Sequence, residues 1–452
     1  MILKDAYSCT HCIETQQLER GASMKSLSHR TFGRAIAFAL AMTLLLTCLS
    51  SAYATTAEPI TIKFWNSFTG ADGDQLVELV DRFNQTNADG IKVEMDISAN
   101  FADQLTSALA AGTGPALVLM SNAMRYQYDG YLQDVSDIFT QTGMDKSDFI
   151  QSYLDYCMDG SAMYLVPFQI VGYYLFWNKD LFTAAGLDPD VAPTTWDEYA
   201  EFAAKLTDAT KNVYGSGLCY NYPYQLAHVI QRFGGLSVTA ADGKWQANFA
   251  GNEGYEKFLV TFKKMIDDGV NPVEADTDPM MMAGQIGMTV SGPWITGGLD
   301  TADIKYGISL LPEGEAGDMN SVEVLGFGVP TVATDAEKAA AYRFIQWWNS
   351  EDASGTSPAL EWATKNGFPA YTYSVQAKDS YQSSEKLRIT SSADPSAPTD
   401  FFVDSRFPDT GTMLFDVLAP LVQRIVFDNT DVATALIDAQ TIADGVVERY
   451  NQ

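Results

Sequence analysis

The sequence predicts an α/β fold in which mostly parallel sheets are flanked by helices. From Ile60 onward, apolar runs of strand length alternate with segments of helical periodicity. A chain of 452 residues is long enough for two or three domains with cores of ordinary size. A content of 46% hydrophobic and 12% aromatic residues is typical of globular proteins and argues against disorder.

The predicted elements follow from these patterns, in chain order. The expected strands are 60–65, 91–97, 116–120, 173–177, 286–290, 306–311 and 322–329. The expected helices are 72–84, 100–111, 196–208, 224–233, 251–268, 335–349 and 434–450. Ligands of such sheets bind where strand ends meet helix N-termini, so the loops after the strands are candidate sites.

The joint that follows the aromatic strand 173–177 carries the most specific local signals. Asn178 can cap a short helix, which Gly186 can end with a positive φ. Thr195 stands three residues before Glu198, the spacing of a capping box at the start of the next helix.

The N-terminus has the three-part order of a secretion signal. A basic region after Met24 precedes the apolar run 35–49 and the small residues around Ala54. The run is too short for a membrane-spanning anchor and contains two threonines. We expect residues 1–54 to be an N-terminal extension and secretion signal, cleaved after Ala54.

Lipidation is the alternative reading of the same region. Cys48 directly follows most of the apolar run, as the lipidated cysteine of a lipoprotein signal does, although Thr47 stands where Gly, Ala or Ser is usual. Both readings predict an exported protein, in the periplasm or on the outer face of the cytoplasmic membrane.

Charge and residue content exclude several classes of function. Of 57 acidic and 28 basic residues, three acidic and five basic precede residue 55, which leaves a net charge of −31. Such a surface repels nucleic acid and anionic lipid, and it does not favour an anionic substrate. His228 is the only histidine after residue 54, which excludes a zinc site built on several histidines. We expect no metal and no cofactor.

Five segments together carry a family resemblance. Residues 61–70, 112–116, 177–196, 287–294 and 306–312 resemble, in order and spacing, the extracellular solute-binding proteins (family 1) of ABC importers. This family includes the maltose-binding and glycerol-phosphate-binding proteins, and the resemblance covers nearly all of residues 60–450.

The resemblance implies a two-lobed periplasmic-binding-protein-like fold of type II with three hinge crossings. By analogy, the crossings lie near 167–169, 325–326 and 371. Lobe 1 would comprise 55–168 and 326–370, and lobe 2 would comprise 169–325 and 371–452. Cys157 and Cys219 would then lie in different lobes, where a disulfide would oppose closure, so both thiols are expected to be unpaired.

The resemblance also implies a binding protein that is not an enzyme. It would capture a neutral sugar or oligosaccharide between the lobes and deliver it to the transmembrane subunits of an ABC permease. A secreted glycoside hydrolase or lyase is the rival, but it needs two carboxylates flanking the bond at ~5–9 Å, and no acidic pair stands in a recognisable catalytic motif.

A sugar site needs flat aromatic platforms surrounded by amides, hydroxyls or carboxylates. Trp294 follows Gly-Pro at a strand end and must project from a loop, where it faces either the ligand or the core. The resemblance favours Trp294 and Tyr224 as platforms. The full set of expected ligand-binding residues is Asn66, Ser67, Phe68, Thr69, Ser121, Asn122, Gln169, Tyr173, Tyr222, Tyr224, Trp294 and Gly326.

One departure from the family bears on the ligand. The glycerol-phosphate binder uses an Arg in its C-terminal cleft segment, whereas the matching stretch 411–417 has none. A neutral carbohydrate is therefore expected in preference to a polyol phosphate. Arg406 is a nearby basic group that keeps the phosphate alternative open.

Overall fold

The structure is a computed structural model that describes residues 59–314, 322–391 and 407–451. All of them belong to one compact unit, Glu58–Gln452. The predicted secretion signal, Cys48 and Arg406 lie outside the described residues.

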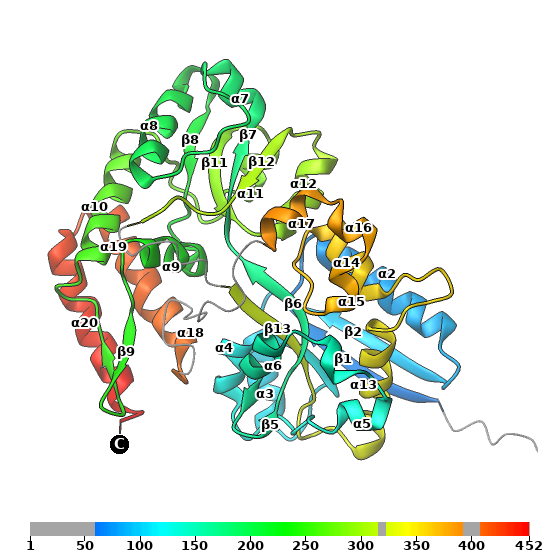
Figure 1. Cartoon of the computed structure of the whole chain (residues 1–452). Coiled ribbons are helices and arrows are strands. Elements are labelled where there is room, and N and C mark those ends of the chain that lie inside the picture. Colours follow the sequence, from blue (N-terminus) through cyan, green and yellow to red (C-terminus); the bar gives the residue numbers. More distant parts are fainter. Residues whose placement is uncertain (1–58, 315–321, 392–406, 452) are drawn as a thin grey trace, which may run out of the picture. The chain divides into compact units, whose positions relative to one another are not determined.

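The first sheet has five strands in the order β2-β1-β3-β13-β6 (Figure 1). They are β1 (Ile60–Asn66), β2 (Ile91–Ile97), β3 (Leu117–Ser121), β6 (Val166–Gly172) and β13 (Val322–Gly328). Helices α2 (Ala71–Thr86) and α13 (Asp335–Trp348) pack on β2 and β1, and α14 (Pro358–Asn366) packs against both helices. Phe64, Leu76 and Phe344 are fully buried in this first core.

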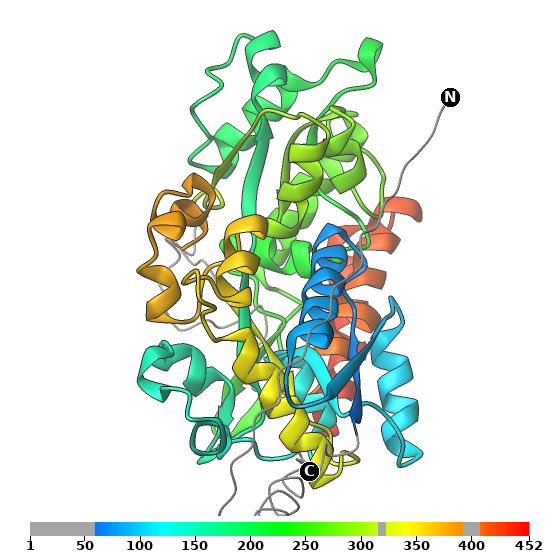
Figure 2. The same ribbon diagram turned by 90° about the vertical axis from the view of Figure 1, so that its right-hand side faces the viewer.

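The second sheet has four strands in the order β12-β7-β11-β8. They are β7 (Tyr174–Asn178), β8 (Tyr214–Gly217), β11 (Ile286–Ser291) and β12 (Tyr306–Ser309). Helix α8 (Trp196–Leu206) packs on β8, and α9 (Pro223–Arg232), α10 (Glu253–Asp267), α19 (Ala419–Phe427) and α20 (Val432–Glu448) form a connected helical layer (Figure 1). Helix α20 is drawn in red in Figure 2. Leu175, Leu226 and Val422 are among the fully buried residues of this second core.

Shorter elements connect these layers. The helices are α3 (Phe101–Ala110), α4 (Asn122–Arg125), α5 (Ile138–Thr142), α6 (Gln151–Tyr156), α7 (Lys179–Ala184), α11 (Asp278–Met282), α12 (Thr296–Thr301), α15 (Tyr373–Gln376), α16 (Asp379–Gln382), α17 (Glu385–Thr390) and α18 (Thr410–Thr412). Strands β4 (Met158–Asp159) and β5 (Ala162–Met163) form one hairpin, and β9 (Val238–Ala241) and β10 (Lys244–Ala247) form another. The 3₁₀ turns are η1 (Tyr126–Tyr128), η2 (Lys146–Asp148), η3 (Ala209–Lys211) and η4 (Pro293–Ile295), and η5 (Met413–Leu418) is a π-helix.

The predicted fold class is confirmed, with one difference in the sheets. Both sheets are mixed instead of mostly parallel. In the first sheet β13 runs antiparallel to β3 and β6, and in the second β7 runs antiparallel to β11 and β12. The reason is topological, because a strand that enters a sheet from the other sheet arrives without the helical crossover that a parallel neighbour requires.

The capping signals after β7 are present in the structure. Asn178 Oδ1 accepts hydrogen bonds from the backbone N–H groups of Asp180 and Leu181 at 3.0 and 3.1 Å, and Gly186 has φ 74°. Thr195 Oγ1 accepts from the N–H of Glu198 at 3.2 Å. The reciprocal bond differs from the expected capping box, since the Glu198 carboxylate accepts from the N–H of Thr194.

The strands place the changes of sheet near the expected crossings but not at them: the second lies between β12 and β13, before 325–326. Strand β6 belongs wholly to the first sheet and β7 to the second, so the first change lies at Tyr173. Strand β13 also lies wholly in the first sheet, and Tyr371, Val375 and Leu387 pack in the first core. The segment after 371 therefore packs with lobe 1 as far as these residues, and the lobe boundaries given above remain a prediction.

One helical stretch, Thr410–Phe427, is long and apolar enough to cross a membrane by length and composition. Half of it is buried in the structure, and Met413, Leu418 and Val422 are core residues. Such burial is typical of a core helix in a soluble protein.

Both described cysteines are free and buried. Cys157 lies in the first core, and the Sγ of Cys219 lies 3.4 Å from Thr277 Oγ1, beside the second sheet. Burial raises the pKa of Cys157 to about 12 and that of Cys219 to about 11.

Candidate functional site

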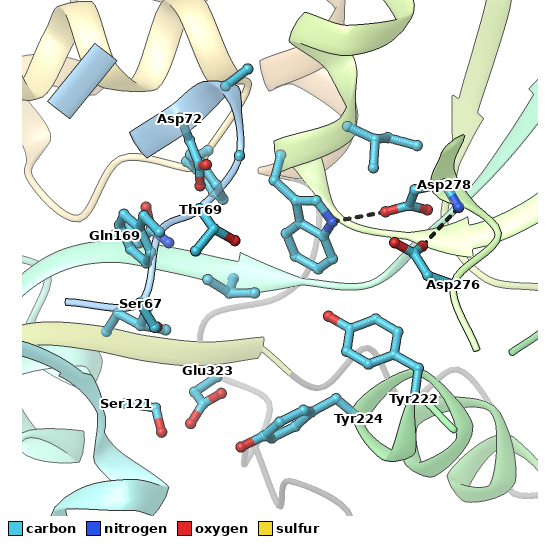
Figure 3. A pocket seen from close by; sticks show the side chains of 18 of the residues that line it. Ser67, Thr69, Asp72, Ser121, Gln169, Tyr222, Tyr224, Asp276, Asp278 and Glu323 are labelled. Carbon is cyan, nitrogen blue, oxygen red and sulfur yellow. Dashed lines mark hydrogen bonds between the residues drawn. The ribbon is translucent and has the colours of Figure 1, made fainter. Parts of the chain in front are cut away.

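A cavity of about 770 Å³ is lined by segments that follow strands of both sheets (Figure 3). The loop after β1 contributes Ser67 and Thr69, and the end of β3 contributes Ser121. The start of α9 contributes tyrosines, Asp276 lies just before α11, and Asp278 is the first residue of α11. The cavity thus forms where the strand-end loops of an α/β protein are expected to bind a ligand.

Trp294 is held from two sides while it lines the cavity. Its indole Nε1 donates a hydrogen bond to Asp278 Oδ2 at 3.2 Å, and Ser291 Oγ donates to the same oxygen at 3.0 Å. Its ring packs edge to face against Tyr173, with the ring centroids 5.3 Å apart, and it also packs against residues of both main cores. Because a Cβ at Gly292 would overlap the indole ring, only glycine fits before Pro293 in this arrangement.

Three tyrosines extend the aromatic lining. Tyr173 Oη donates to Tyr222 Oη at 2.9 Å, and the Tyr173 ring lies 4.2 Å from the His228 ring. Tyr224 meets Phe415 edge to face at 5.7 Å. Burial raises the pKa of all three tyrosines, so they act at neutral pH as hydroxyl donors and apolar surfaces.

Four carboxylates also line the cavity: Asp72, Asp276, Asp278 and Glu323. Asp72 and Glu323 are only 8% and 6% exposed. The residues found in the lining include no Lys, Arg or His among the described part of the chain. The site is therefore acidic as well as aromatic.

Burial, together with the neighbouring charge of Asp276, raises the pKa of Asp278 to about 7. The hydrogen bonds from Ser291 and Trp294 act in the opposite direction. Burial likewise raises the pKa of Asp72, against a hydrogen bond from the Gly73 N–H. Burial and like charge thus favour the protonated forms of Asp72 and Asp278 while the cavity is empty.

Nine of the twelve predicted site residues line the cavity: Ser67, Phe68, Thr69, Ser121, Gln169, Tyr173, Tyr222, Tyr224 and Trp294. Two of these also serve the core. Gln169 Oε1 accepts from Trp362 Nε1 at 2.8 Å, and Phe68 stacks on the same Trp362 ring at 5.9 Å.

The other three predicted residues are absent from the cavity lining, and their contacts explain why. Asn66 turns inward, where its Oδ1 accepts from the Phe68 N–H at 3.0 Å, and Asn122 Oδ1 accepts from Arg125 Nε at 2.9 Å. A Cβ on Gly326 would meet Leu165 Cβ at 2.7 Å, so this glycine allows close strand packing instead of ligand approach.

The sequence did not predict the four carboxylates as residues of the site. Asp276 and Asp278 lie just before and at the first residue of the short helix α11, with no strand or cofactor motif beside them, and Asp72 resembles an ordinary acidic residue in the first turn of a helix. Their joint position is a tertiary property. Among the described residues, no group of three or more His, Cys, Asp or Glu side chains is arranged to hold a metal ion.

Comparison with known sequences and structures gives consistent matches. The profile of a family described as bacterial extracellular solute-binding protein matches residues 78–389. The sn-glycerol-3-phosphate-binding periplasmic protein UgpB of Shigella dysenteriae is 34% identical over 189 residues, which are 40% of this chain and 42% of that protein. The match thus spans less than half the length of this curated relative.

Two solved structures share the fold at lower identity. One is an ABC transporter solute-binding protein from Thermotoga lettingae bound with α-D-tagatose, with a TM-score of 0.73 and 21% identity. The other is maltose-bound MalE3 of T. maritima, with a TM-score of 0.72 and 18% identity. Each alignment covers 86% of this chain and 100% of the other.

Proposed function

Because the chain belongs to the bacterial extracellular solute-binding protein family, we propose that it is the capture component of an ABC importer for a saccharide without an anionic group. The ligand would bind between the two sheets and favour a closed form that docks on the permease. The observation that carries this proposal is one cavity whose lining, among the described residues, combines aromatic rings, hydroxyls and carboxylates without a basic residue.

The lining matches the two kinds of surface that a sugar presents. The C–H faces of a sugar ring pack on flat aromatic rings, which Trp294, Tyr222 and Tyr224 supply. Sugar hydroxyls need acceptors and donors, which carboxylates and the hydroxyls of Ser67 and Thr69 supply. The tagatose-bound and maltose-bound neighbours are consistent with this ligand class.

A polyol phosphate is the second candidate, because the curated relative binds sn-glycerol 3-phosphate. Phosphate recognition depends on Arg, Lys or convergent N–H donors. The described lining instead presents four carboxylates, which repel a phosphate. We therefore favour a saccharide, with glycerol 3-phosphate as the decisive comparison ligand.

We further propose that the protein is not an enzyme and that it is exported. The family and the structural neighbours are binding proteins. The location would be the periplasm or the outer face of the cytoplasmic membrane, with lipidation at Cys48 as the alternative to cleavage after Ala54. The mass of the protein recovered from its native membrane fraction distinguishes these two forms of processing.

A thermal-shift screen with a panel of mono- and oligosaccharides and glycerol 3-phosphate tests the proposal. We expect at least one saccharide to raise the Tm and to be recovered intact after incubation. A Tm increase with glycerol 3-phosphate but with no saccharide would instead support phosphate capture. The appearance of hydrolysis products would show that the protein is an enzyme.

A further inference from the structure

Asp276 and Asp278 present two carboxylates to the same side of the cavity. Asp276 Oδ1 accepts a hydrogen bond from the backbone N–H of Asp278 at 2.9 Å, which fixes the two residues relative to each other (Figure 3). Asp278 Oδ2 in turn accepts from Ser291 and Trp294. The acidic pair is therefore built into the cavity wall.

The donors that hold this pair do not neutralise its charge. Ser291 Oγ and Trp294 Nε1 are uncharged donors, and none of the ion pairs between described residues involves Asp276 or Asp278. Two further carboxylates, Asp72 and Glu323, line the same cavity. Enclosing a ligand here would desolvate like charges, which is costly unless the ligand compensates them.

Aromatic side chains beside the pair add a second attraction for positive charge. Trp294 lies within hydrogen-bonding distance of Asp278, and Tyr222 lines the cavity close to both acids in Figure 3. The faces of such rings attract ammonium groups, with Trp the strongest. A sugar hydroxyl donates one hydrogen bond and brings no positive charge to the pair, whereas an ammonium group donates three and carries a charge opposite to that of the carboxylates.

A metal ion fits this arrangement less well than an amine. Hard cations such as Ca²⁺ require six or more oxygen ligands. Among the described residues, no group of three or more metal-ligating side chains is present. An ammonium ion needs fewer partners and gains from aromatic rings.

We infer that the captured saccharide carries a protonated amino group, which binds against the Asp276–Asp278 pair beside Trp294 and Tyr222. The inference rests on the proposed capture of a saccharide and specifies its class as an amino sugar or an oligosaccharide that contains one. The remaining hydroxyls of the ligand would meet the polar groups of the opposite wall, including Ser67 and Thr69.

The test compares sugars that differ only by an amine in place of a hydroxyl. Glucosamine with glucose, galactosamine with galactose, and the β-1,4 disaccharide of glucosamine with cellobiose form three such pairs. Calorimetry at neutral pH should show the amine bound about ten-fold more tightly or better in at least one pair, a difference of about 1.4 kcal/mol. N-acetylated glucosamine, which has no charge, should lose this advantage.

The outcomes separate this inference from the proposed function. Equal or tighter binding of the hydroxyl partner would overturn the inference and leave saccharide capture intact. If no member of any pair binds, and no other saccharide of the thermal-shift panel does, both fail. Tight binding of glycerol 3-phosphate would also overturn both.

Two variants test whether the amino group of the ligand binds at the Asp276–Asp278 pair. Asp276→Asn and Asp278→Asn each keep a hydrogen-bond acceptor but remove a charge, so each should reduce the amine-to-hydroxyl affinity ratio several-fold, whatever its effect on the affinity for the neutral sugar. Asp81→Asn is the matched control, because it removes an exposed charge on α2 outside the cavity, and it should leave the ratio unchanged. An unchanged ratio in both cavity variants would overturn the assignment.

Discussion

The Trp294 indole and the Asp278 carboxylate form one hydrogen-bonded unit, with Nε1 and Oδ2 3.2 Å apart. The unit joins the aromatic surface of the cavity to its negative charge. Because the same carboxylate oxygen also binds Ser291 at the end of β11, the orientation of the indole is tied to a buried strand.

Replacing Trp294 by Ala should weaken saccharide binding about ten-fold or more, because the ring supplies stacking area that no neighbour replaces. Calorimetry measures the loss, and circular dichroism checks that the protein remains folded. Trp245→Ala removes a half-buried Trp from β10, outside the cavity, and should leave the affinity unchanged. Unchanged affinity in the Trp294 variant would remove this residue from the site.

Gly292→Ala should reproduce much of this loss of saccharide affinity, although it changes no side chain that contacts the ligand. The new Cβ would overlap the indole ring, so Trp294 must move away from Asp278. Gly297→Ala is the matched control, because its Cβ would meet only Ala71 Cβ at an ordinary 3.7 Å. We expect ligand affinity to fall several-fold in the first variant alone. Equal affinities of the two variants would contradict the positioning role of Gly292.

The raised pKa of Asp278, about 7, predicts how stability of the ligand-free protein depends on pH. The folded state holds this proton up to about pH 7, whereas the unfolded carboxyl loses it near the ordinary pKa of 3.8. The contribution is therefore full below about pH 3.8 and is lost as the pH rises towards 7. Relative to wild type, Asp278→Asn should gain stability across this interval, as Tm values at several pH values would show. Parallel Tm profiles of the two proteins would argue that Asp278 titrates normally.

Tyr173→Phe should cost about 1 kcal/mol of stability, because it removes the hydrogen bond to Tyr222 and leaves a buried hydroxyl without that donor. Urea denaturation measures the change. Tyr306→Phe removes a tyrosine hydroxyl bonded to the exposed Asp300 and should cost less. Equal losses would show that the Tyr173 contact contributes nothing specific.

The two described thiols should stay reduced and unreactive in the native mature protein. Both are buried, and burial raises the pKa of each thiol, so little thiolate is present at neutral pH. A thiol reagent should modify two cysteines only after denaturation. A two-dalton mass increase on reduction of the mature chain would instead reveal a disulfide.

Local sequence signals predicted the scaffold of the site better than its charge. The Gly-Pro-Trp sequence correctly placed Trp294 outside the strand, in the turn η4 that follows β11, because proline cannot donate to strand pairing. The cap at Asn178 was equally local. Such features depend only on neighbours in the chain.

The position of the Asp276–Asp278 pair and the orientation of the two amides wrongly assigned to the site depend on tertiary structure. Asp276 and Asp278 reach the cavity from a segment more than 50 residues beyond Tyr222, and no periodicity marks them. Asn66 and Asn122 stand at the correct strand ends, but each side chain bonds its own loop or helix. Strand position fixes where a residue lies, while local hydrogen bonding decides which way it points.

Tyr173 is both the residue between the two sheets and a wall of the cavity. Any rotation of the main chain at this point must carry a ligand-facing ring with it. A substitution that changes ligand preference here would therefore also change the connection between the two sheets, so selectivity and that connection cannot be adjusted independently at this position.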